Sequence, residues 1–121
     1  MNIAHVTPED NLNLCDSGNF DFCLAHIAIK NKEYKKFFMD RVLSGRELYL
    51  DNGVWETGYP LDKDIMIELA IGMDATYVYA PDYMCEKKKT LDAIEEFGDI
   101  ASNTKGFNSK IIGVMQGRTR E

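Results

Sequence analysis

Short apolar runs alternate with longer amphipathic segments along the chain, and this alternation restricts the fold more than any other feature. The apolar runs lie at residues 22–29, 47–50, 76–79 and 110–115. The segments between them, at 32–43, 62–71 and 86–102, repeat apolar residues at helical spacing. Short, continuous apolar runs are typical of strands buried on both faces, so we expect strands joined by helices.

The strand and helix order predicts parallel strands joined by crossover helices. Two architectures fit: a small open α/β sheet, and half of a (β/α)8 TIM barrel, which needs about 250 residues when complete. The 121-residue chain ends just after the fourth predicted strand, with no helix to cover it. We expect the first four βα units of a TIM barrel over residues 20–121, after a lead-in segment at 1–19. This half barrel would continue in a longer protein or require a partner.

The stretch LYLDNGVWE, residues 48–56, offers a competing interpretation. An Asn-Gly pair between apolar residues is a strong signal for a tight β-hairpin. The residues that follow include Gly58 and Pro60 and then a predicted helix, so no strand returns to complete a hairpin. We therefore expect a loop after a strand, with Asp51 at the end of that strand.

Composition narrows the classes of function. A net charge of −6 disfavours a protein that coats nucleic acid, but it permits an enzyme with one local patch. The lysines near residues 30–36 and 87–89 are explained most simply as solvated helix faces. Three cysteines without C-x-x-C spacing indicate reduced thiols and a cytoplasmic protein, and we expect no membrane partner. The cysteines and two histidines lack metal-ligand spacing, so we expect no metal site.

Polar side chains follow the predicted strands, where parallel α/β folds bind their ligands. Asp51 is the candidate catalytic residue at this rim. The candidate substrate-binding residues are His26, Asn52, Trp55, Asp82, Gln116 and Gly117. Their coincidence at successive strand ends predicts one site, since carboxylates and an amide match a purine edge and an aromatic ring stacks on its face.

Most of these residues also have a structural explanation. Asp51 and Asp82 are of the type that forms turns or caps helices, and His26 fits a core histidine with satisfied hydrogen bonds. Trp55 fits a packing residue as well as a stacking one. Gln116 is harder to explain structurally, because an amide at the end of a buried strand needs a partner. Gly117 would let a ligand approach the backbone.

Three motifs, LDNGVWE, APDYM and IIGVMQG, lie at the strand ends in that order. Together they resemble the tRNA-guanine transglycosylase superfamily, and are most similar to its compact phage and bacterial members associated with 7-deazaguanine modification of DNA. The resemblance covers residues 20–121. It implies a TIM barrel and a pentosyltransferase that replaces guanine in DNA or tRNA with a 7-deazaguanine, through a covalent aspartyl-nucleoside intermediate.

The same resemblance implies a role for each matching residue. Asp51 would be the catalytic acid/base, and Asn52 falls where the family has a serine. Trp55 would stack on the base and Asp82 would read the guanine edge. Gln116 would contact the base oxygen, with Gly117 beside it.

The chain also departs from the family pattern. Val54 replaces a glycine and Glu56 replaces a glutamine, which crowds and recharges the loop that contacts the base. The family's aspartate nucleophile and zinc ligands belong to the second half of its barrel, so the resemblance implies no cofactor in this chain. Two alternatives stay open: a TIM-barrel hydrolase that uses Asp51 and Asp82, and an incomplete half barrel that only binds nucleic acid or a protein.

Overall fold

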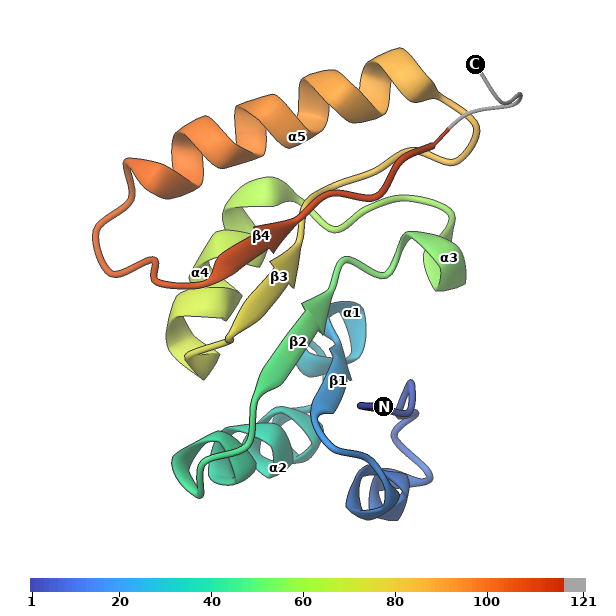
Figure 1. Ribbon diagram of the computed structural model, residues 1–121, viewed down its shortest axis with the longest axis vertical. Helices are drawn as coiled ribbons and strands as arrows, with labels where there is room; N and C mark the ends of the chain where they lie inside the picture. The colour runs from blue at the N-terminus through green and yellow to red at the C-terminus, as the bar shows by residue number, and fades with distance from the viewer. Residues whose placement is uncertain (117–121) are drawn as a thin grey trace.

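A parallel sheet of four strands forms the centre of the protein, as seen in a computed structural model that describes residues 1–116 (Figure 1). Its strands are β1 (Asp21–Leu24), β2 (Leu48–Asp51), β3 (Tyr77–Tyr79) and β4 (Lys110–Ile112). The strand order is β1-β2-β3-β4, and every neighbouring pair is parallel. The predicted crossover order is therefore confirmed, and the hairpin interpretation of Asn52 and Gly53 is excluded.

The helices follow the strands in the predicted places. The longer ones are α2 (Lys32–Leu43), α4 (Lys63–Met73) and α5 (Lys87–Ser102), and the shorter ones are η1 (Leu12–Ser17, a 3-10 helix), α1 (Ala25–Ala28) and α3 (Val54–Thr57). Local side chains set two of the starts. Asn31 caps α2 by accepting the backbone N–H groups of Glu33 and Tyr34, and Asp62 caps α4 in the same way. None of the helices among the described residues has the length and apolar character needed to cross a membrane.

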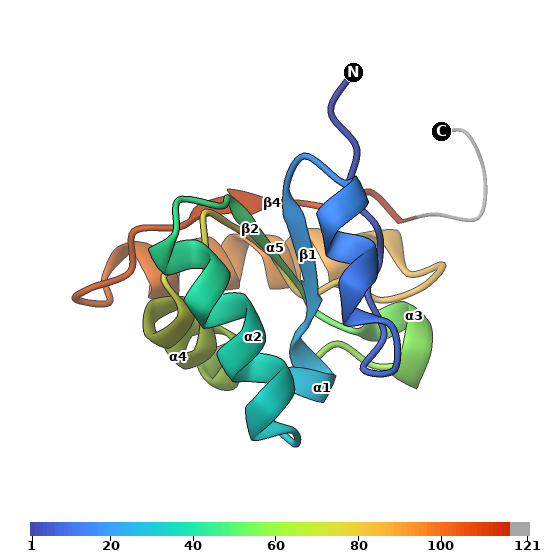
Figure 2. The same ribbon diagram turned by 90° about the horizontal axis from the view of Figure 1, so that it is seen from below.

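The sequential strand order determines where the helices lie. Right-handed crossovers between strands added always on the same side place every crossover helix on one face of the sheet. Figure 2 shows α2 and α4 together on one side of the strands. Leu48, Leu50 and Val78 are fully buried on alternate strand positions, which forms the core between sheet and helices. The protein is thus an α/β fold whose sheet is compatible with half of a β/α barrel.

The intervening strand positions form a second, aromatic face of the sheet. The rings of Phe20 and Tyr49 lie 4.3 Å apart and those of Tyr49 and Tyr77 lie 4.4 Å apart, measured between centroids. Nearer the carboxyl ends, Phe22 and Tyr79 lie 5.7 Å apart. These rings are only partly buried. Cross-strand aromatic pairs of this kind stabilise neighbouring strands.

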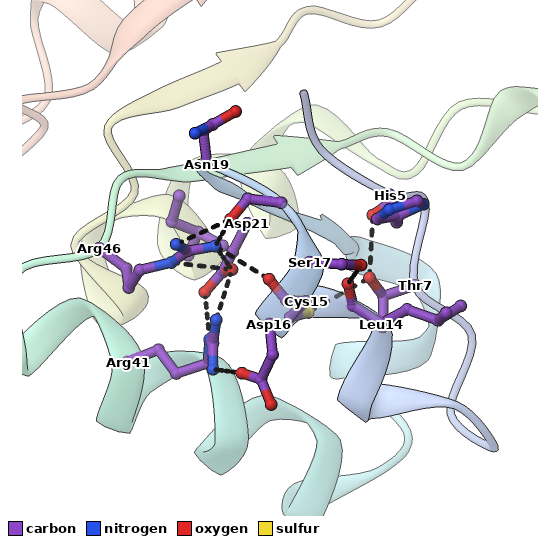
Figure 3. Close-up of polar contacts among 12 residues, drawn as sticks. His5, Thr7, Leu14, Cys15, Asp16, Ser17, Asn19, Asp21, Arg41 and Arg46 are labelled. Atoms are coloured by element: carbon purple, nitrogen blue, oxygen red, sulfur yellow. Dashed lines mark hydrogen bonds and ion pairs between the residues drawn. The ribbon is translucent and has the colours of Figure 1, made fainter. Parts of the chain in front are cut away.

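At the opposite, amino end of the strands, two arginines surround one buried carboxylate, and we call Asp21, Arg41 and Arg46 the amino-end cluster (Figure 3). Asp21 is 1% exposed and accepts hydrogen bonds from Arg41 Nε at 2.6 Å and Arg46 Nη2 at 2.8 Å. Arg46 also donates to the carbonyls of Cys15 and Gly18. The cluster therefore ties the lead-in segment to the sheet and to α2.

Three local predictions were wrong. The strand predicted at 22–29 ends at Leu24, and the rest of that apolar run turns into α1, so His26 is helical. Ala25 and Ala28 are small and buried, which lets the chain turn where the run was expected to stay extended. The strand predicted at 110–115 ends at Ile112, and the loop after β2 contains the unexpected helix α3.

Candidate functional site

A cavity of about 360 Å³ lies at the carboxyl ends of the strands. Four of the predicted site residues line it: Asp51, Trp55, Asp82 and Gln116. The other lining residues are mostly apolar or contain sulfur: Phe22, Val54, Tyr79, Met84, Cys85 and Val114. A small, largely apolar cavity with a few converging polar groups is the usual form of a small-molecule site.

Asp51 ends β2 and is half-buried at the cavity. Its Oδ2 accepts the N–H of Gly53 at 3.0 Å, which fixes the carboxylate at the start of the loop. Burial raises the pKa of the Asp51 carboxyl, the Gly53 hydrogen bond opposes this rise, and the negative charges of Glu56 and Asp82 add to it. Within residues 1–116, no ion pair reaches Asp51. A carboxyl with a raised pKa in a cavity is suited to transfer protons.

Gly53 allows the chain to turn sharply after Asp51. Its φ of +76° lies in the left-handed region, and a Cβ at this position would lie 2.6 Å from His26 Nδ1. Both constraints favour glycine here. The Asn-Gly pair therefore does form a turn, but the turn leads into α3 instead of a returning strand.

His26 does not lie where the sequence placed it. It lies on α1 and lines a separate cavity of about 260 Å³ together with Asn52 and Tyr59. Its Nδ1 is buried and has no hydrogen-bond partner in the described part of the chain. His26 does not reach the rim because β1 ends two residues before it, at Leu24. A substrate contact for His26 at the Asp51 cavity is not supported by this position.

Asp82 lies in a hydrogen-bonded group that we call the amide–carboxylate relay: the buried Asn52 and Asp82, and the partly buried Gln116. Asp82 is 2% exposed; its Oδ1 accepts Asn52 Nδ2 at 2.7 Å and its Oδ2 accepts Gln116 Nε2 at 2.6 Å. Asp82 does not cap α5, whose N-cap is Glu86. The interpretation of Asp82 as a turn or cap residue therefore does not describe its role.

Asn52 has a structural role in this relay. Its Nδ2 also donates to the Ala80 carbonyl at 2.8 Å, and its Oδ1 accepts the N–H of Val54 at 2.9 Å. The residue is 1% exposed and does not line the Asp51 cavity. The expected substrate contact is thus replaced by contacts that connect β2, β3 and α3.

Trp55 lies at the rim of the cavity on α3, and its side chain is 81% exposed. An indole this exposed makes little packing contribution, so the packing explanation for Trp55 loses its basis. An exposed ring at the rim of a cavity is available for contact with a ligand.

Several lining residues were missed in the sequence. Phe22 and Tyr79 alternate with the buried Cys23 and Val78, so strand periodicity was the signal that could have found them. Burial raises the pKa of the Tyr79 hydroxyl, and the charge of Asp51 raises it further, so this hydroxyl keeps its proton. Cys85 has a φ of +62°, an unusual value for a residue with a side chain, and nothing in the sequence indicated it.

Two further expectations concern Gly117 and a metal ion. Gly117 lies outside the described residues. Within residues 1–116, no group of three or more His, Cys, Asp and Glu side chains is placed to hold a metal ion.

Comparison with known proteins adds no relative: no family model matches the chain, and neither a curated protein nor a solved structure matches it. Its function must therefore be inferred from the residues and their geometry.

Proposed function

We propose that the chain is the N-terminal half of a (β/α)8 barrel that binds a guanine-type base and exchanges it for a 7-deazaguanine in DNA or tRNA. One observation carries the proposal. A carboxyl with a raised pKa, Asp51, lines an apolar cavity whose rim bears the exposed Trp55. A planar heteroaromatic base fits this combination, because its face stacks on an indole and its edge hydrogen-bonds to the few polar groups that line the cavity.

Asp51 serves as the acid/base of the exchange. A carboxylate nucleophile, which the sequence resemblance locates outside this chain, bonds to C1′ while the C1′–N9 bond of the nucleotide breaks. Asp51 gives its proton to the departing guanine, and takes a proton from the incoming deazaguanine in the reverse step. Its raised pKa suits both directions, because the carboxyl exchanges its proton more easily near neutral pH.

The open side of the sheet agrees with a half barrel. The aromatic face with Tyr49 and Tyr77 is partly exposed, and β1 and β4 are the edges of the sheet. Strands of a longer protein, or of a second copy, would complete the barrel and cover these groups. We place this activity in the cytoplasm, where the nucleic acid substrate and free thiols such as Cys15 and Cys23 are found together.

Base binding without exchange is the second candidate. It is favoured by the fact that the cavity with Asp51, Trp55 and Gln116 is formed within residues 1–116, whereas the nucleophile is assigned to none of them. The hydrolase alternative is weaker, because both oxygens of Asp82 already accept amide hydrogen bonds and the group is buried.

Titration calorimetry with guanine and 7-deazaguanine tests the binding step. We expect both bases to bind the wild-type chain, and Asp51→Asn to weaken binding about tenfold or more, a loss of about 1.4 kcal/mol. Asp64→Asn is the matched control, since it neutralises an exposed carboxylate on α4 outside the cavity. Equal affinities for wild type and Asp51→Asn would remove Asp51 from the site.

Incorporation of labelled guanine into DNA or tRNA tests the exchange step in the protein that contains this chain. Exchange predicts label in the nucleic acid. A hydrolase would release base without incorporating label, and a binding module would do neither.

A further inference from the structure

The amide–carboxylate relay fixes the direction in which each of its amides points. An ionised carboxylate only accepts hydrogen bonds, so both amides that face Asp82 must turn their NH2 groups toward it. Asn52 is oriented a second time by the backbone, because its NH2 also meets the Ala80 carbonyl and its oxygen meets the Val54 N–H. Backbone groups just after β2 and β3 therefore fix the orientation of the Asn52 amide.

At its other end the relay reaches the cavity. Gln116 donates one N–H of its Nε2 to Asp82, so its carbonyl oxygen, Oε1, is turned away from Asp82. That oxygen lies 3.5 Å from the backbone N of Cys85, which is a weak contact and leaves it able to accept a further hydrogen bond. Gln116, Cys85 and Asp51 all line the cavity. Gln116 and Asp51 thus present acceptor oxygens to a ligand.

We propose that Asp82 is a positioning residue that turns the Gln116 carbonyl toward the cavity, so that the site selects a planar base whose edge carries hydrogen-bond donors. This inference rests on the proposed function. It changes the roles expected from the sequence, in which Asp82 reads the base and Gln116 contacts its oxygen. A guanine-type edge, with its ring N–H and its exocyclic amine, supplies donors to these acceptors, and a base without the amine leaves an acceptor unpaired.

Guanine and hypoxanthine are the probes, because they differ only in the exocyclic amine. We expect the wild-type chain to bind guanine at least about tenfold more tightly than hypoxanthine in calorimetry. Asp82→Asn would keep a carbonyl for Asn52 while turning an NH2 toward Gln116, and this forces Gln116 to turn its own NH2 to the cavity. The preference for guanine should then fall to about onefold or reverse. An unchanged preference in Asp82→Asn overturns the proposal, as does equal binding of both bases by the wild type.

Two further measurements keep the test decisive if Asp82→Asn does not fold. Gln116→Met leaves the Asn52–Asp82 pair intact and removes the acceptor, so the preference for guanine should be lost. Gln116 is also the chain's single glutamine, so selective 15N labelling gives one side-chain NH2 signal. We expect the NH2 proton that Asp82 accepts to exchange slowly with solvent in the free wild-type chain, and rapid exchange of both NH2 protons would overturn the orientation of Gln116.

The outcomes separate this inference from the proposed function. A wild-type chain that binds neither base overturns the proposed function and the selectivity together. A chain that binds both bases equally overturns only the selectivity.

Discussion

The two ends of the same sheet treat a carboxylate in opposite ways. At the amino end, Asp21 is 1% exposed and is held by the guanidinium groups of Arg41 and Arg46. At the carboxyl end, Asp51 is half-buried, and no ion pair reaches it within residues 1–116. Its hydrogen bond from the Gly53 N–H does not outweigh burial, and the pKa of Asp51 is raised.

This difference separates a carboxylate whose charge is compensated by cations from one whose charge is not. A buried carboxylate with two cations has its charge compensated, and its removal leaves two guanidiniums without a partner. A carboxyl whose burial is only partly compensated costs free energy in the charged form, and such groups are concentrated at functional sites. We therefore expect loss of the Asp21 carboxylate to affect mainly stability and loss of the Asp51 carboxylate to affect mainly binding.

The largest effect should come from Asp21→Ala. Removal of one partner from a buried ion pair is strongly destabilising, so we expect the free energy of unfolding to fall by about 3 kcal/mol in urea denaturation followed by circular dichroism. Asp16→Ala is the matched control, because Asp16 also pairs with Arg41 but its side chain is 74% exposed. That variant should lose less than about 1 kcal/mol. Similar losses for the two variants would show that the cluster is not the stabilising end.

Gly53→Ala should have the next largest effect. The substitution combines a left-handed φ with a Cβ placed 2.6 Å from His26 Nδ1, so we expect a loss of about 2 kcal/mol in the same assay. Gly58→Ala has a φ of +85° with no atom within 4 Å of the new Cβ, and should lose only about 1 kcal/mol. Adding His26→Ala to Gly53→Ala should recover part of the difference, whereas purely additive losses would exclude the contact.

Asp51→Asn should make the chain more stable at neutral pH, by roughly 0.5–1 kcal/mol. Because the pKa of Asp51 is raised above its usual 3.8, the folded chain holds this proton where the unfolded chain has lost it. The free energy of unfolding of the wild type therefore falls as pH rises through this window, and the variant lacks that fall. Below pH 3.8 the two proteins should converge. A larger free energy of unfolding for the wild type than for the variant at neutral pH would mean that the Asp51 charge is stabilising.

Trp55→Ala should have the smallest effect on stability, within about 0.5 kcal/mol, because its side chain is 81% exposed. Binding of guanine should nevertheless weaken about tenfold, since stacking of a base on an aromatic ring contributes about 1–3 kcal/mol. Tyr59→Ala is the matched control: Tyr59 is 76% exposed near the same loop but lines the other cavity. Equal affinities for the two variants would remove Trp55 from the base site.

The parts of the fold that depend on local signals could be predicted. Helix α2 has the predicted bounds, because Asn31 caps its start and Ser44 and Gly45 follow its end. The parallel order followed from the spacing of apolar runs. The end of β1 could not be predicted, because an apolar run does not reveal whether it is extended or helical until its partners are known.

The site residues could be predicted where the ends of the strands could be predicted. Asp51, Trp55, Asp82 and Gln116 line one cavity as expected. The buried role of Asn52 depends on partners about thirty positions away in the sequence, at Ala80 and Asp82. The amino-end cluster was missed for the same reason. No local sequence pattern links Asp21 with Arg41, which lies in α2, or with Arg46, which follows α2.

Trp55 is the chain's single tryptophan, and its exposure at the cavity rim makes it an intrinsic optical reporter. Its fluorescence in the folded state should already resemble that of an indole in water, so unfolding should shift the emission little. A base stacked on the ring should instead quench it. Tryptophan emission can therefore follow ligand binding. In the same sample, the signal of the stacked tyrosines Tyr49 and Tyr77 reports on the integrity of the sheet.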